Sequence, residues 1–162
     1  MYEVRRKEKE VTDRTWMEDI LKRGRFMHLA MAGADGWPYV VPIGYGYGGG
    51  AIYMHGAPEG RKNDILAANP RVCFQVTLDA EVQPSDVGAN FTMKYRSVTG
   101  FGVVHALTDP RERNAALKIL MEHYGYGGHH ADLPDTAEAH KKLWVARLDI
   151  ESMTGKKSVY PS

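Results

Sequence analysis

The sequence contains a single cysteine, Cys73, and almost no excess of charge of either sign. One cysteine excludes an intrachain disulfide and a zinc site built from several thiolates, and it favours a reducing, cytoplasmic location. Lysine and arginine number 21 and aspartate and glutamate 20, which gives a formal net charge of +1. The composition therefore gives no support for a nucleic-acid-binding protein.

The chain also lacks a segment suited to secretion or to crossing a membrane. Its N-terminal residues, MYEVRRKEKEVTD, are charged and contain no apolar core of a signal peptide. The uncharged stretch 36–58 has the length of a membrane span, but its seven glycines and three prolines exclude a stable helix. We therefore predict one globular domain over residues 1–162, with no membrane association.

Capping residues, turn residues and apolar spacing together predict a mostly β, α+β fold. Asp13 and Asp109 are suited to cap two helices, and Asn69-Pro70 ends a third. Five or six antiparallel strands with peripheral helices indicate a small barrel. The expected helices cover 13–23, 61–68, 110–124 and 136–142, and the expected strands cover 26–32, 37–47, 51–55, 71–78, 93–107 and 143–151.

Two prolines interrupt the expected strand 37–47. Pro38 and Pro42 have no backbone N–H and cannot donate to a neighbouring strand. Part of this strand must therefore face an edge, a bulge or a ligand rather than a paired neighbour.

The sequence Gly60-Arg61-Lys62 lies where a short helix is expected to begin. A helix N-terminus has free N–H groups and the positive end of the dipole, and the two cations add charge at the same place. These features suit a terminal phosphate group. The alternative is a pair of solvated surface cations.

Two further interpretations concern histidine. His55 ends the strand expected shortly before Gly60. It either faces a ligand held by Arg61 and Lys62 or is hydrogen-bonded at the rim of a barrel. The histidines at 123, 129, 130 and 140 lack the spacing of a familiar metal site, so we expect no metal. We interpret Cys73, in a strand, as a small hydrophobic residue without a catalytic role.

Several motifs in a fixed order resemble the pyridoxamine 5′-phosphate oxidase-like proteins, which have an FMN-binding split β-barrel. They are PYVVPIGYGY, GGAIYMHGAPEGRKNDILAANPRVCFQV, KYRSVTGFGVVHALTDPRERNAALKILMEHY and LDIESMTGKKS, and together they extend over about residues 11–158. Within this family the sequence is most similar to the nitroimidazole-resistance branch. The resemblance implies a six-stranded antiparallel split barrel with peripheral helices.

The resemblance also implies FMN bound at the interface of a homodimer. Arg61 and Lys62 match the pair that grips the FMN phosphate, and the strand 41–43 matches the backbone along the isoalloxazine edge. His55 matches a histidine near the flavin and substrate. The remaining matches are Arg96 and Ser97, in a segment that reaches the flavin from the second subunit, and Trp144, an aromatic residue near the ring. The residues of the matching strand are Val41, Pro42 and Ile43.

One departure from the family concerns the end of the chain. The vitamin B6 oxidases carry a C-terminal arginine and histidine that bind substrate, whereas this sequence ends in GKKSVYPS. The first hypothesis is therefore an FMN-dependent oxidoreductase that acts on a small nitroaromatic such as a 5-nitroimidazole. The alternatives are a non-enzymatic flavin- or haem-binding protein and a homodimer whose site has decayed. Some relatives bind haem or F420 in place of FMN.

Overall fold

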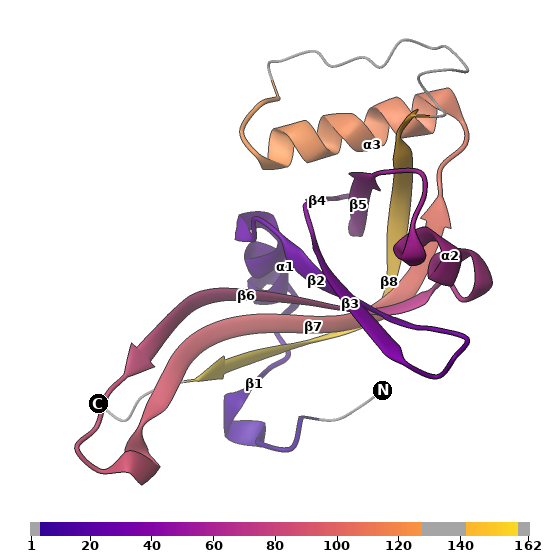
Figure 1. The fold of residues 1–162 in the computed structure, drawn as a ribbon. Helices are drawn as coiled ribbons and strands as arrows, with labels where there is room; N and C mark the ends of the chain where they lie inside the picture. The colour runs from indigo at the N-terminus through magenta and orange to yellow at the C-terminus, as the bar shows by residue number, and fades with distance from the viewer. Residues whose placement is uncertain (1–3, 128–141, 159–162) are drawn as a thin grey trace.

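The computed structural model describes residues 4–127 and 142–158 (Figure 1). Three α-helices and eight β-strands make up most of this part of the chain, with two short 3-10 helices, η1 (Lys7–Lys9) and η2 (Gly88–Asn90). The mostly β, α+β fold is therefore confirmed. The helix expected at 136–142 and the histidines at 129, 130 and 140 fall on residues 128–141 and so lie outside the described residues, except for Lys142.

The helices begin where the capping residues predicted. They are α1 (Arg14–Arg23), α2 (Arg61–Ala68) and α3 (Pro110–His123). The Asp13 carboxylate accepts hydrogen bonds from the amides of Thr15 and Trp16, and the Asp109 carboxylate does the same for Arg111 and Glu112. None of the helices in the described part of the chain is long and apolar enough to cross a membrane.

All strands belong to one antiparallel sheet of eight, two more than the expected six. The order is β3-β2-β6-β7-β8-β5-β4, and the short β1 pairs with β8. The additional strands are β1 and the second half of the segment expected as one strand at 37–47. The bounds are β1 Glu10–Val11, β2 Met27–Ala32, β3 Pro38–Ile43, β4 Tyr45–Gly48, β5 Ala51–Gly56, β6 Arg71–Gln83, β7 Thr92–Ala106 and β8 Trp144–Ser158.

The two ends of this sheet are joined by a single residue. β3 and β4 lie at opposite ends of the strand order, yet only Gly44 separates them in the chain. The sheet must therefore curl until its ends approach, although no strand pairing joins β3 to β4. An antiparallel sheet that curls in this way without closing its last ladder is a split barrel.

Gly44 has little room for a side chain. A Cβ atom there would lie 2.8 Å from the hydroxyl oxygen of Tyr124, which donates to the carbonyl of Arg25 and accepts from the amide of Tyr45. Tyr124, directly after α3, thus links the junction between β3 and β4 to the residues that precede β2.

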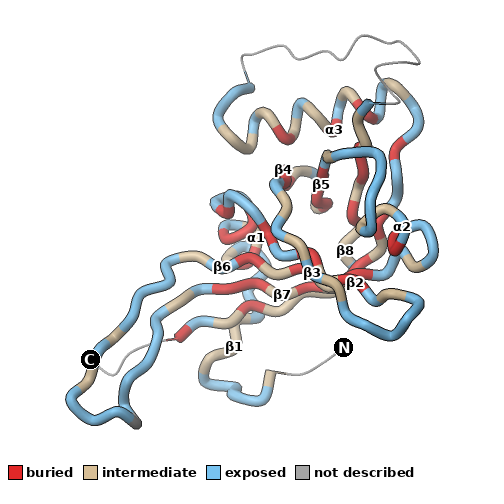
Figure 2. The backbone as a smooth tube through the Cα atoms, viewed as in Figure 1, coloured by how far each residue is buried: buried red, intermediate tan, exposed pale blue. Residues whose placement is uncertain are grey.

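The hydrophobic core fills the curled sheet and continues beneath α1. It contains fully buried side chains from strands distant in sequence, among them Leu29, Phe74, Val98 and Leu148, together with Ile20 of α1. The buried segments gather at the centre of the molecule in Figure 2.

Strands β6, β7 and β8 extend beyond this core as an arm. We use "the arm" for the paired residues 78–83, 92–97 and 156–158. The expected strands end at Leu78 and Glu151, whereas β6 continues past an irregularity between Leu78 and Glu81 and β8 pairs with β7 as far as Ser158. Most of the arm's outer end is exposed (Figure 2).

Candidate functional site

A pocket of about 310 Å³ lies between β3, the end of β5 and the start of α2. Six of the predicted site residues line it, so the structure brings them together from three separate segments. They are Val41, Pro42, Ile43, His55, Arg61 and Lys62. The other lining residues are Tyr39, Gly56, Glu59 and Gly60.

One wall of the pocket is an edge strand. β3 pairs with β2 and ends the strand order, so its other side has no strand neighbour among the described residues. Pro42 lies opposite His28 in the ladder and lacks an N–H to donate. Val41 and Ile43 are half-buried against the core. This wall therefore offers an apolar surface with some backbone groups free for a ligand.

The start of α2 forms a second wall. Gly60 precedes the helix with φ of +117°, a conformation that favours glycine, and it has no side chain to cap the first amides. The exposed Arg61 guanidinium lies 3.5 Å from the carboxylate of Asp35 and 5.0 Å from the centre of the Tyr39 ring. These weak contacts leave Arg61 able to turn toward an anion.

Lys62 is the most constrained cation of the pocket. Its ammonium nitrogen is buried, has no hydrogen-bond partner among the described residues, and lies 3.6 Å from the centre of the Trp144 ring. A Cβ on Gly56 would come 3.4 Å from the same nitrogen. Because burial removes hydration from the charged form, the pKa of Lys62 falls from 10.5 to about 8. A buried ammonium without a partner is suited to receive an anion.

Trp144 does not line the pocket, but its ring lies against the ammonium group of Lys62. It begins β8 and lies opposite Gly56 in the β5–β8 ladder. The glycine leaves space for the lysine to pass over the indole face, where a cation is attracted by the ring electrons. The predicted aromatic residue is thus placed beside the cation rather than at an exposed pocket wall.

His55 lies at the mouth of the pocket near the end of β5, opposite Val145 of β8. Its pKa is lowered, first because the imidazole loses hydration in the pocket and second because the positive charge of Lys62 is close. His55 is therefore mostly neutral at pH 7, and a neutral imidazole carries one N–H donor and one acceptor nitrogen.

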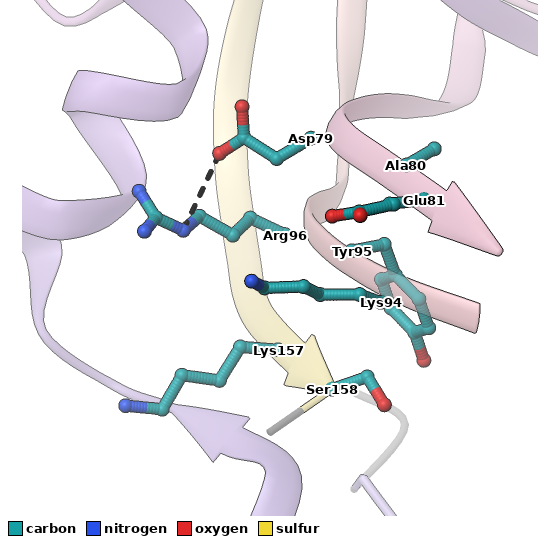
Figure 3. Close-up of a pocket in the computed structure, with 8 residues that line it drawn as sticks. All are labelled: Asp79, Ala80, Glu81, Lys94, Tyr95, Arg96, Lys157 and Ser158. Carbon is teal, nitrogen blue, oxygen red and sulfur yellow. Dashed lines mark ion pairs between the residues drawn. The ribbon is translucent and has the colours of Figure 1, made fainter. Parts of the chain in front are cut away.

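Arg96 and Ser97 do not line this pocket. Both belong to the part of β7 in the arm, where Arg96 lines a separate cleft of about 760 Å³ (Figure 3). The Arg96 guanidinium lies 3.4 Å from the Asp79 carboxylate. The buried Ser97 hydroxyl donates to the carbonyl of Lys156 at 3.5 Å. Within one chain these two residues are not brought to the pocket.

Tyr39 and Glu59 also line the pocket, although neither was among the predicted site residues. Tyr39 was detectable, because it alternates with Val41 and Ile43 along the same strand and must share their side of the sheet. Glu59 had no signal beyond its place before Gly60. Among the described residues, no group of three histidine, cysteine, aspartate or glutamate side chains is placed to hold a metal ion.

The structure thus combines a split antiparallel barrel with an apolar edge strand, a helix that begins after a glycine, and a buried cation in one pocket. The family model of pyridoxamine 5′-phosphate oxidase matches residues 13–157. The chain therefore belongs to the pyridoxamine 5′-phosphate oxidase family. No curated protein sequence gives a significant match.

Several solved structures have a similar fold. One is a protein from Bacteroides thetaiotaomicron assigned provisionally to 5-nitroimidazole antibiotic resistance, with 27% identity, a TM-score of 0.76, and coverage of 91% of this chain and 86% of that one. The flavocytochrome Anf3 from Azotobacter vinelandii has 22% identity and a TM-score of 0.84, over 99% of this chain and 74% of that one. A FAD and haem binding protein from Mycobacterium smegmatis has 24% identity and a TM-score of 0.81, over 95% and 76%.

Proposed function

We propose that the protein is an FMN-dependent oxidoreductase that reduces small nitroaromatics such as 5-nitroimidazoles. The observation that carries this proposal is the buried ammonium group of Lys62, which lies in the same pocket as Arg61 and has no hydrogen-bond partner in the described part of the chain. A terminal phosphate is the ligand group that best satisfies two adjacent cations at a helix start. The similarity to a protein assigned to 5-nitroimidazole resistance supports the substrate class.

The residues present fit the parts of FMN. Lys62, Arg61 and the free amides at the start of α2 would hold the phosphate, and the edge of β3 at 41–43 would lie along the flavin ring. The bound flavin supplies the electron chemistry, and the protein supplies binding and orientation. The apolar wall of Val41 and Ile43 would keep water from one side of the ring.

His55 would act on the substrate rather than on the phosphate. Reduction of a nitro group to a nitroso group takes up two electrons and two protons and releases water. The neutral imidazole carries an N–H that can donate to the nitro oxygen as negative charge develops there. The lowered pKa of His55 favours this neutral form at pH 7.

We further propose a homodimer with FMN at the interface. Two large apolar side chains in or directly before β3 are exposed, with Trp37 71% exposed and Val40 58% exposed. Contiguous exposed apolar surface is typical of association sites. A second copy would also supply Arg96 and Ser97, which cannot reach the pocket of their own chain. A species of about 18 kDa in light scattering, the mass of one chain, would contradict the dimer.

The experiment that tests the function begins with the absorption spectrum of the purified protein, before and after heat release of any ligand. We expect a flavin spectrum and release of FMN. The flavin is then reduced chemically in the absence of oxygen and mixed with a 5-nitroimidazole. Rapid return of the oxidised flavin spectrum, with loss of the nitro absorption, supports the proposal. A reduced flavin that persists for as long as it does without substrate would contradict it.

The second candidate is a non-enzymatic flavin- or haem-binding protein, and His55 is the observation that favours the haem form. Neutral imidazole is the form that binds haem iron, and the lowered pKa keeps His55 in that form. A Soret band that disappears in His55→Ala would identify this function. Release of F420 in place of FMN would assign a deazaflavin to the same pocket.

A further inference from the structure

Apart from the pocket described above, a cationic cleft lies on the arm. It is lined by the N-terminal segment, the start of β7 and the end of β8. Its volume is about 340 Å³. Four of the described residues that line it are cations, and none of the described lining residues is acidic. The lining residues are Arg5, Arg6, Lys9, Thr92, Met93, Tyr95, Lys156 and Ser158. We call it the N-terminal cleft.

Strand register explains why these side chains meet. Tyr95 pairs with Ser158, and Ser97 pairs with Lys156, so Tyr95, Ser158 and Lys156 share one face of the arm. Lys94, Arg96 and Lys157 project from the opposite face, into the cleft drawn in Figure 3. The N-terminal segment is held over the first face by β1, which pairs with β8, and by the Lys9 ammonium, which donates to the Ser158 hydroxyl at 3.3 Å.

In the part of the chain that the structure describes, no carboxylate lines this cleft. Glu10 lies opposite Lys156 in the β1–β8 ladder, but its carboxylate is paired with Lys7 at 3.1 Å. No ion pair joins Arg5, Arg6 or Lys156 to an acid within residues 4–127 and 142–158. In a chain of net charge +1, four cations gathered without an acid in their lining repel one another unless an anion joins them.

We propose that the N-terminal cleft is an anion site for a diphosphate group, either free or carried on a nucleotide. The two guanidinium groups and two ammonium groups can bind more of the negative oxygens of a diphosphate, which has two adjacent phosphorus atoms, than of a single orthophosphate. The hydroxyls of Thr92 and Ser158 add donors at the rim. The half-buried ring of Tyr95 offers a surface on which a base can stack.

The test uses calorimetric titration of the full chain with pyrophosphate, ADP and orthophosphate at low ionic strength, repeated at about 0.15 M salt. We expect pyrophosphate to bind more tightly than orthophosphate and to weaken with salt. The double variant Arg5→Ala/Arg6→Ala should weaken pyrophosphate roughly tenfold or more, because contacts of guanidinium with phosphate are among the stronger hydrogen bonds. The variant Lys156→Ala should weaken it in the same direction.

The matched control is Arg71→Ala/Arg111→Ala, which removes the same charge from exposed positions outside the cleft. It should leave pyrophosphate affinity unchanged. The two sources of the diphosphate are distinguished by Tyr95→Leu. If ADP binds more tightly than pyrophosphate to the parent protein and Tyr95→Leu removes this difference, the ligand is a nucleotide. If ADP and pyrophosphate bind equally in the parent and in Tyr95→Leu, the ligand is the free anion.

Three results would overturn this proposal. They are the absence of measurable pyrophosphate binding at low salt, equal losses in the cleft variant and the charge-matched control, and equal affinities for orthophosphate and pyrophosphate. Titration of the protein loaded with FMN separates this site from the flavin pocket, because filling that pocket should leave pyrophosphate affinity unchanged. Loss of pyrophosphate binding on FMN loading but not in Arg5→Ala/Arg6→Ala would place the anion in the flavin pocket and refute the N-terminal cleft.

Discussion

Replacing Lys62 by methionine should stabilise the protein without cofactor at pH 7. Burial lowers the pKa of this amine from 10.5 to about 8. At 1.36 kcal/mol per pKa unit the free-energy cost has an upper bound of about 3 kcal/mol, and partial exposure of the side chain reduces it to about 1–2 kcal/mol. The lost contact with Trp144 offsets roughly 0.5–1 kcal/mol of this gain. We therefore expect a net stabilisation of about 1 kcal/mol.

The sign of this effect depends on pH. Between pH 8 and pH 10.5 the folded protein binds fewer protons at Lys62 than the unfolded chain does, so its stability rises with pH. The cost of the buried ammonium is complete below pH 8 and disappears as the pH approaches 10.5. Urea unfolding of the two cofactor-free proteins should therefore show an advantage of the variant at about pH 7 that shrinks toward pH 10.

The same substitution should weaken FMN by roughly 10–100-fold, the scale of one hydrogen bond to a charged group. Riboflavin lacks the phosphate, so its affinity should barely change. A variant that is less stable than the parent at pH 7 would show that the ammonium already has a compensating partner. Equal losses of FMN and riboflavin would show that Lys62 does not contact the phosphate.

Three further substitutions test other residues. Arg61→Ala should weaken FMN binding by about 1–2 kcal/mol, measured by fluorescence titration. The loss should be smaller than in Lys62→Met because the guanidinium is exposed. An unchanged affinity would remove Arg61 from the site. His55→Ala should keep FMN but lose roughly 10²–10⁴-fold in turnover of a nitroaromatic, whereas a lower melting temperature at constant turnover would show a structural role only. Gly44→Ala should lower the free energy of unfolding by about 1–3 kcal/mol, because the new Cβ displaces the Tyr124 hydroxyl from its two hydrogen bonds. An unchanged urea midpoint would contradict this account.

Local chemistry made parts of the fold predictable. The carboxylates of Asp13 and Asp109 cap their helices as their positions indicated, and α2 spans the expected residues 61–68. The outer parts of β6 and β8 were missed because their sequences, DAEVQ and TGKKS, lack the apolar alternation of a half-buried strand. Their pairing partners are remote in the chain, so their strand state depends on contacts that local patterns do not contain.

The candidate site was predictable to a different degree at each residue. The spacing of Gly60, Arg61 and Lys62 indicated an anion site, and the resemblance to a family joined it to His55 and to the strand 41–43. Neither source indicated that Lys62 would lie over the Trp144 ring, because that contact depends on the β5–β8 register and on the space left by Gly56. Arg96 and Ser97 are remote from the pocket in one chain, and only an assembly can test their predicted role.

The position of β8 in the strand order has a consequence for how the chain folds. This last strand of the described part lies between β7 and β5, and it also pairs with β1. Until it docks, the hairpin β4–β5 has no sheet neighbour and is joined to the rest of the sheet through Gly44. Pairings of such large sequence separation form slowly, since their loop-closure entropy must be overcome first. We therefore expect the barrel to stay open during synthesis until residues 144–158 have left the ribosome, and the pocket between β3 and β5 to be among the last parts of the molecule to form.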